Sequence, residues 1–149
     1  MMSSENGHGE RRFFIFGAGY SGQAFARAND RQAPVLGTTR APEKFDALRQ
    51  AGIEPLRFDG APTSEIGDAL ARMTHLVVSV APDEAGDPVL NAVGATIREK
   101  MPALEWIGYL STVGVYGDHG GAWVDETAEC KPVSKRSMQR VAAERDWQE

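Results

Sequence analysis

Three glycines near the start of the chain have the spacing of a phosphate-binding turn. Gly17, Gly19 and Gly22 form a G-x-G-x-x-G motif directly after the apolar run Phe13–Phe16. In such a motif the first glycine allows a sharp turn, the second lets a pyrophosphate approach the backbone, and the third lets a helix pack closely on the strand. The N-terminus of that helix adds N–H groups and partial positive charge. We therefore predict that the phosphates of a dinucleotide bind at Gly17, Gly19, Tyr20, Ser21 and Gly22; the alternative is a glycine-rich turn in another kind of α/β protein.

The residues after the second expected strand indicate which dinucleotide would bind. A site for NAD usually has an acidic residue about 20 positions past the glycines, for the ribose 2′-hydroxyl. Here that place reads Gly-Thr-Thr-Arg and carries no carboxylate. Arg40 offers a planar guanidinium to a 2′-phosphate, with Thr39 before it and Lys44 four residues on. We expect NADP rather than NAD, although Arg40 could instead end a strand in water.

Two further residues follow strands at the edge where ligands bind in such folds. Asp59 comes after the third expected strand, where its side chain can meet the adenine edge or only form a turn before Gly60. Ala81 ends the fourth expected strand. Because ligands bind outside the carboxyl ends of parallel strands, we assign both residues to the cofactor site.

The elements that must position these residues alternate between strand and helix. Expected strands cover residues 13–16, 34–39, 54–58, 75–80 and 106–110, and expected helices cover 21–29, 42–51, 64–73, 88–100 and 132–147. This alternation predicts an α/β protein with a Rossmann-type, doubly wound parallel sheet in the order 3-2-1-4-5 and helices on both faces. We expect a flexible tail over 1–12 and one nucleotide-binding domain over 13–149.

The composition of the chain limits the kinds of molecule that it is expected to bind. The chain has 149 residues, 42% hydrophobic and 25% charged, with a net charge of −5. This balance argues against nucleic acid as a partner, and no apolar run approaches a membrane span. The single cysteine, Cys130, excludes an internal disulfide and suits the cytoplasm. We read it as incidental rather than as a nucleophile.

A second motif carries a resemblance to a known family. At 111–117 the sequence S-T-V-G-V-Y-G, together with the glycine motif and the order of elements, resembles the extended short-chain dehydrogenases/reductases. These are NAD(P)-dependent epimerases, dehydratases and reductases, and many act on nucleotide sugars. The resemblance covers essentially the whole chain. Full members continue into a C-terminal substrate-binding part, so this chain looks like the nucleotide-binding portion of a longer protein or a reduced relative.

The resemblance also implies catalytic positions, and the sequence departs from them. Thr112 matches the family residue that holds the reacting oxygen. The family's Tyr-x-x-x-Lys pair, counted back from Glu144, falls on Arg136 and Arg140. An arginine titrates too high to exchange a proton near neutral pH, although Arg140 could still bind the cofactor ribose. The chain thus resembles the atypical branch of the family, in which the catalytic pair is changed.

Other candidate groups remain open. Tyr116 is either a packed tyrosine or a substitute acid. His119 is a solvated loop residue, or else a base or ligand. Asp125 with Glu126 is a solvated or helix-capping pair, or else an acid/base pair. One histidine with scattered acids predicts no metal site.

Three functions compete on this reading. The first is dinucleotide binding with weak or no standard turnover, and the second is an active NADP-dependent reductase or epimerase that uses Thr112 and a non-standard acid such as Tyr116. The third is an interaction protein with a vestigial site, against which the glycine motif argues. We also expect a homodimer through helices 88–100 and 132–147, because family members pair by these helices and an open fifth strand favours association.

Overall fold

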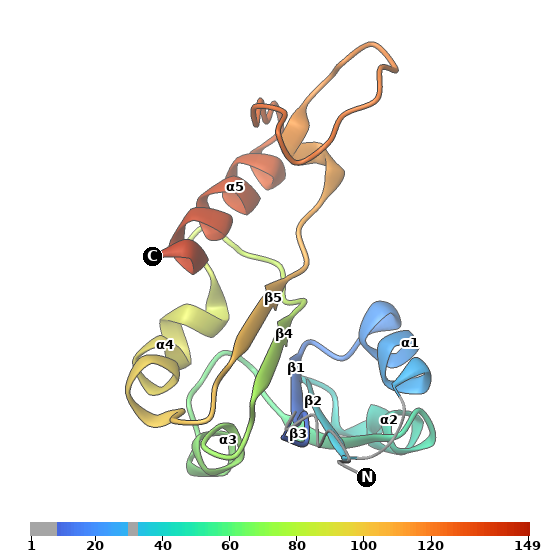
Figure 1. The fold of residues 1–149 in the computed structure, drawn as a ribbon, viewed down its shortest axis with the longest axis vertical. Helices are drawn as coiled ribbons and strands as arrows, with labels where there is room; N and C mark the ends of the chain where they lie inside the picture. The colour runs from blue at the N-terminus through green and yellow to red at the C-terminus, as the bar shows by residue number, and fades with distance from the viewer. Residues whose placement is uncertain (1–8, 30–32) are drawn as a thin grey trace, which may run out of the picture.

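The computed structural model describes residues 9–29 and 33–149 and contains one parallel sheet of five strands (Figure 1). Its strand order, β3-β2-β1-β4-β5, confirms the predicted 3-2-1-4-5 topology, and every pair is parallel. Residues 1–8 of the predicted tail lie outside the described residues. Arg12 is attached to the sheet, because its carbonyl accepts from the backbone N–H groups of Thr74 and His75 at 3.0 Å each. The strands are β1 Phe13–Phe16, β2 Val35–Thr39, β3 Ile53–Arg57, β4 His75–Val78 and β5 Trp106–Tyr109.

Helices cover both faces of the sheet, as predicted, with small differences in their bounds. The α-helices are α1 Tyr20–Ala28, α2 Phe45–Gln50, α3 Ser64–Leu70, α4 Pro88–Lys100 and α5 Lys135–Gln148, with 3-10 turns η1 Pro42–Lys44 and η2 Val113–Tyr116. The last helix begins at Lys135 rather than at 132, because Ser134 is the N-cap and its hydroxyl accepts from the Ser137 N–H. None of the helices in the described part of the chain is long and apolar enough to cross a membrane.

Alternating side chains of the central strands form two buried layers. Phe14 and Phe16 pack on one side with residues of α3 and α4, whereas Ile15 packs on the other with residues of α1 and α2. All three side chains have no exposed surface. A strand buried on both faces is typical of a parallel sheet between helix layers, and it fixes the position of the glycine turn that follows β1.

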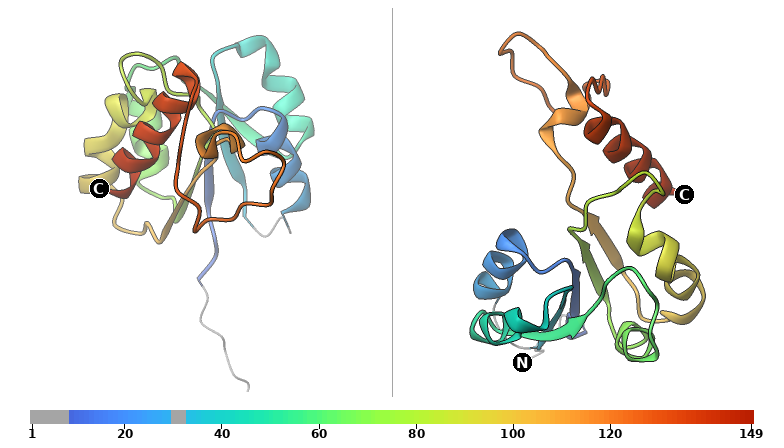
Figure 2. Two further views of the ribbon diagram at one scale, coloured as in Figure 1. Left: turned by 90° about the horizontal axis from the view of Figure 1, so that it is seen from above. Right: turned by 180° about the vertical axis from the view of Figure 1, so that it is seen from behind.

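The chain after β5 departs from this two-layer arrangement. We call residues 110–148, which contain η2, a long loop and α5, the C-terminal arm. The arm projects beyond the carboxyl edge of the sheet, and only the C-terminal half of α5 returns towards α4 and β5 (Figures 1 and 2). It carries most of the large exposed apolar side chains of the described residues: Leu110, Val113, Trp123, Val124, Val133 and Met138.

Candidate functional site

A cleft of about 810 Å³ lies at the carboxyl edge of the sheet. It is formed where β1, β2, β3 and β4 end, which is where ligands bind in open α/β sheets. The cleft brings together seven of the residues predicted from sequence to bind cofactor: Gly17, Gly19, Thr39, Arg40, Lys44, Asp59 and Ala81.

The glycine turn is held in place from two neighbouring strands. Gly17 has a φ of +80°, and a Cβ there would lie 3.1 Å from the Ser79 backbone and from the Val80 side chain. The Gly17 N–H donates to the Thr38 hydroxyl at 2.9 Å, and the Ala18 N–H donates to the Thr38 carbonyl at 2.8 Å. A side chain at position 17 would therefore meet both backbone strain and a steric contact.

The start of α1 presents backbone N–H groups beside this turn. Gly19 is the N-cap, and a Cβ there would meet no described atom within 4 Å, so the backbone is open to a ligand. A Cβ at Gly22 would lie 3.1 Å from Ile15 Cγ2, which explains the close packing of α1 on β1. Tyr20 and Ser21 are exposed at the first turn and do not line the cleft with their side chains. Their contribution to a phosphate site would come from their backbone N–H groups.

Sequence reasoning missed two residues that shape this turn. Thr38 is buried and lines the cleft, and its hydroxyl accepts from the Gly17 N–H. Gly37 lies where a Cβ would be 2.8 Å from Ile53 Cγ2 and 2.9 Å from Ala18 Cβ, so β2 and the turn need a glycine there. The small-polar run G-T-T was the signal, but its partner residues are 16 to 21 positions away.

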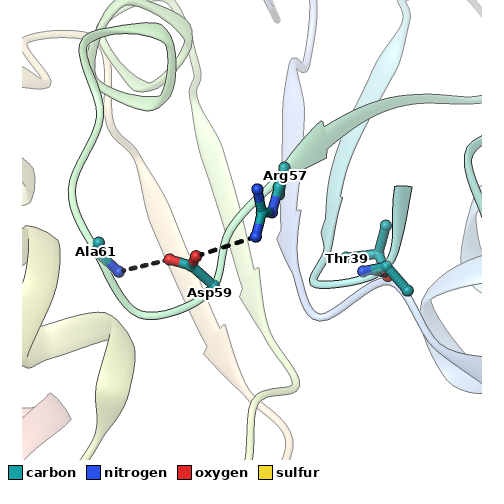
Figure 3. Close-up of polar contacts among 5 residues, drawn as sticks. Thr39, Arg57, Asp59 and Ala61 are labelled. Atoms are coloured by element: carbon teal, nitrogen blue, oxygen red, sulfur yellow. Dashed lines mark hydrogen bonds and ion pairs between the residues drawn. The ribbon is translucent and has the colours of Figure 1, made fainter. Parts of the chain in front are cut away.

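Charged side chains gather at the end of the cleft formed by β2 and β3. Arg40 and Lys44 are exposed and line it, together with the carboxylate of Asp59. Asp59 accepts from the Ala61 N–H at 3.2 Å and forms an ion pair of 3.5 Å with Arg57 (Figure 3). The Phe58 N–H donates to the Thr39 carbonyl at 3.1 Å, which holds the ends of the two strands together.

The opposite end of the cleft is formed by the loop after β4. Ala81, Asp83 and Ala85 line it, followed by Pro88 and Asn91 of α4. The Asp83 carboxylate accepts from the Ala85 N–H at 2.8 Å, so the loop is a turn closed on itself. This end therefore offers the Asp83 carboxylate and the Asn91 amide, whereas the other end offers the cations Arg40 and Lys44.

The predicted catalytic residues lie in the C-terminal arm and do not line the cleft. Thr112 is exposed and caps η2, with its hydroxyl 3.5 Å from the Gly114 N–H that donates to it. Tyr116 is half-buried at the end of η2. Arg136 is exposed. Arg140 donates from Nη1 to the Leu110 carbonyl at 2.8 Å, so its guanidinium is directed at the end of β5.

A polar cluster under α5 involves residues that the sequence did not single out. Asp87 is buried, caps α4 through Oδ1 and accepts from the Trp147 indole at Oδ2, at 3.0 Å. The Tyr109 hydroxyl is buried and has no hydrogen-bond partner among the described residues. Burial raises the pKa of Tyr109 above its ordinary value, and the Arg140 guanidinium, 5.8 Å from the ring centre, only partly opposes this. This phenol is therefore neutral at physiological pH.

The remaining candidate groups belong to turns of the arm. His119 Nε2 donates to the Tyr116 carbonyl at 2.9 Å. Asp125 accepts from the hydroxyl and the N–H of Thr127, and these hydrogen bonds hold its pKa below the ordinary value. It is exposed in a turn that no helix follows directly, so it is a solvated residue rather than a helix cap. Cys130 is half-exposed. No cluster of metal-ligating side chains occurs in residues 9–29 and 33–149.

Several solved structures have the same arrangement of strands and helices. Neither a protein-family model nor a curated protein matches the sequence. A functionally unknown conserved protein from Silicibacter pomeroyi DSS is 44% identical, with a TM-score of 0.82. A dTDP-glucose 4,6-dehydratase from Bacillus anthracis, solved with NAD, is 14% identical with a TM-score of 0.72, and a short-chain dehydrogenase/reductase superfamily protein from Agrobacterium tumefaciens, with bound NAD, is 14% identical with a TM-score of 0.63. The chain therefore has the Rossmann-like fold of these proteins.

The alignments cover a larger share of this chain than of the solved structures. The alignments cover 93%, 92% and 91% of this chain but only 49%, 49% and 43% of the three structures. The chain thus spans about half the length of the solved structures that it matches.

Proposed function

We propose that this chain binds a nicotinamide dinucleotide in the cleft at the carboxyl edge of the sheet, and that it prefers NADP to NAD. The observation that carries the proposal is the convergence of the open glycine turn and the cations Arg40 and Lys44 on one cleft. The pyrophosphate would lie against Gly17, Gly19 and the first turn of α1, where N–H groups and the helix dipole favour negative charge. The two structures with bound NAD and the same fold support this placement.

Each end of the cleft would take a different part of the ligand. Arg40 and Lys44, next to Thr39, would hold a ribose 2′-phosphate, since a guanidinium binds phosphate oxygens in pairs. Asp59 would accept from the adenine amine. The nicotinamide half would then extend past Ala81 towards the loop after β4, where Asp83 and Ala85 also line the cleft.

The chemistry expected of this chain alone is weak. General acid catalysis needs a donor with a pKa near the operating pH, and an arginine at position 136 cannot supply one. Thr112 and Tyr116 do not line the cleft, which supports binding without standard turnover over the second candidate, a reductase or epimerase that uses Tyr116 as acid. Arg140 is engaged with the Leu110 carbonyl and would have to leave it to reach a ribose.

A titration tests the proposal directly. The purified chain is titrated with NADPH and with NADH by following nicotinamide fluorescence, and NADPH should bind more tightly. Failure of both nucleotides to bind would overturn the proposal. Carbonyl substrates are then scanned for nucleotide oxidation. Robust NADPH-dependent turnover that Thr112→Ala or Tyr116→Phe abolishes would establish the catalytic candidate instead.

A further inference from the structure

The adenine end of the cleft contains a charge conflict. The cations Arg40 and Lys44 line it, and the acidic residue Asp59 is among the residues that line the same cleft. About half of the Asp59 side-chain surface, 49%, is exposed to solvent. An ionised carboxylate repels a phosphate across a shared cleft, and this repulsion would weaken any ligand with a 2′-phosphate.

Arg57 is placed to remove this conflict. It is the last residue of β3 and pairs in register with Thr39, the last residue of β2, directly before Arg40. Its guanidinium Nη2 lies 3.5 Å from Asp59 Oδ2, while the other carboxylate oxygen accepts from the Ala61 N–H. Figure 3 shows the Asp59 carboxylate between these two groups. The carboxylate is thus oriented by a backbone N–H on one side and paired with a guanidinium on the other.

We propose that Arg57, acting through Asp59, determines the specificity of the adenine end for a 2′-phosphorylated nucleotide. The proposal rests on the proposed function, because it concerns the same cleft. With Arg57 in place, Asp59 can accept from an adenine amine without opposing a neighbouring phosphate, and the two cations that line the cleft are left to bind that phosphate. Arg57 is therefore a positioning residue, whereas Arg40 and Lys44 are the contacts.

The test uses adenine-end fragments, so that the nicotinamide half does not contribute. Adenosine 2′,5′-bisphosphate and AMP are titrated calorimetrically into the wild-type chain and into Arg57→Gln. The variant should bind the bisphosphate about fivefold more weakly, the size of a partly screened charge interaction. Its affinity for AMP should change less than twofold, and Arg57→Lys should retain the wild-type ratio.

A second substitution separates action through Asp59 from direct contact with the phosphate. In the Arg57→Gln background, Asp59→Asn removes the uncompensated carboxylate and should restore binding of the bisphosphate to within twofold of wild type. If Arg57 contacts the phosphate itself, Asp59→Asn restores nothing, and the proposal is overturned. An equal loss for both fragments in Arg57→Gln would also overturn it, since that result indicates a structural role.

A matched control measures the effect of removing any surface cation. Arg49 has a similar exposure, 59% against 62%, and a carboxylate partner, Asp46, at 3.0 Å, but it lies on α2 outside the cleft. Arg49→Gln should leave both affinities unchanged, and a loss equal to that of Arg57→Gln would overturn the proposal.

If wild type binds NADPH and NADH equally, the specificity inference fails while dinucleotide binding stands. If it binds neither, both fail.

Discussion

The glycine-turn end of the molecule and the C-terminal arm differ in how far their apolar side chains are buried. Around the turn, β1 and its neighbours are buried on both faces, and Thr38 and Ser79 meet Gly17 directly. The arm contains six of the eight large apolar side chains that are exposed in the described residues, and Trp123 is fully exposed. The binding turn is thus fixed by packing within the chain, whereas the arm has an exposed apolar surface suited to packing on another molecule.

The turn should tolerate no side chain, and this is the largest effect that we expect. Gly17→Val forces a β-branched residue to a φ of +80° and brings its Cβ within 3.1 Å of the Ser79 backbone. Backbone strain alone costs about 1–3 kcal/mol, and the displaced turn should lose nucleotide binding. Urea unfolding and an NADPH titration measure both effects.

The control for this prediction is Gly67→Ala in α3. A Cβ there meets no described atom within 4 Å, and alanine favours a helix, so stability should stay equal or rise. Wild-type NADPH affinity in Gly17→Val would contradict the prediction that the turn tolerates no side chain.

Arg40→Asp should invert the nucleotide preference without unfolding the protein. Arg40 is exposed, so its replacement disturbs no core packing. An aspartate repels a 2′-phosphate and can accept from a 2′-hydroxyl, so NADPH should weaken by about tenfold or more while NADH strengthens. Separate titrations with the two nucleotides check the prediction, and an unchanged ratio would remove Arg40 from the site.

The arm should mediate self-association, consistent with the predicted dimer through α4 and α5. Within the predicted helix 132–147, Val133 and Met138 are 77% and 53% exposed and are available for this contact, whereas Val141 is buried within the chain. Met138→Glu should lower the light-scattering mass from that of two chains towards that of one, since a charge in an apolar contact is costly. Glu65→Gln in α3 is the control. A wild-type mass of one chain at micromolar concentration would count against the interface.

The smallest effect is expected at Tyr109, beneath the arm. Its pKa is raised in the folded state, mainly by burial, so folding favours the neutral phenol. This contribution is complete below the ordinary pKa of about 10 and is lost as the pH rises through that value towards the folded one. Tyr109→Phe should therefore flatten the decline in stability between about pH 9 and 11 and change little at pH 7, where the hydroxyl has no partner among the described residues. Urea unfolding at each pH tests this.

The sequence predicted the strand order, and seven of the residues that it predicted to bind cofactor line the cleft, because both results depend on local patterns. Buried strands read as apolar runs, and the spacing of Gly17 and Gly19 reflects a turn formed by neighbouring residues. The Gly17–Thr38 hydrogen bond and the Arg57–Asp59 pair could not be predicted, because which side chains face each other at a sheet edge depends on strand register and rotamers. Thr112 and Arg140 could be aligned to family positions from the sequence alone. Their place in space depends on the path of the chain after β5, which leaves them outside the cleft.

The Asp87 carboxylate links the first turn of α4, which lines the cleft, to the last turn of α5 in the C-terminal arm. One of its oxygens accepts from the first-turn N–H groups of Val89 and Leu90, and the other accepts from the indole of Trp147. Lifting α5 away would leave a buried carboxylate oxygen without its donor, at a cost of about 1–3 kcal/mol. The first turn of α4, which contributes Pro88 and Asn91 to the cleft, and the last turn of α5 thus share one acceptor. Local opening of the arm and protection of the α4 amides from hydrogen exchange should therefore be linked.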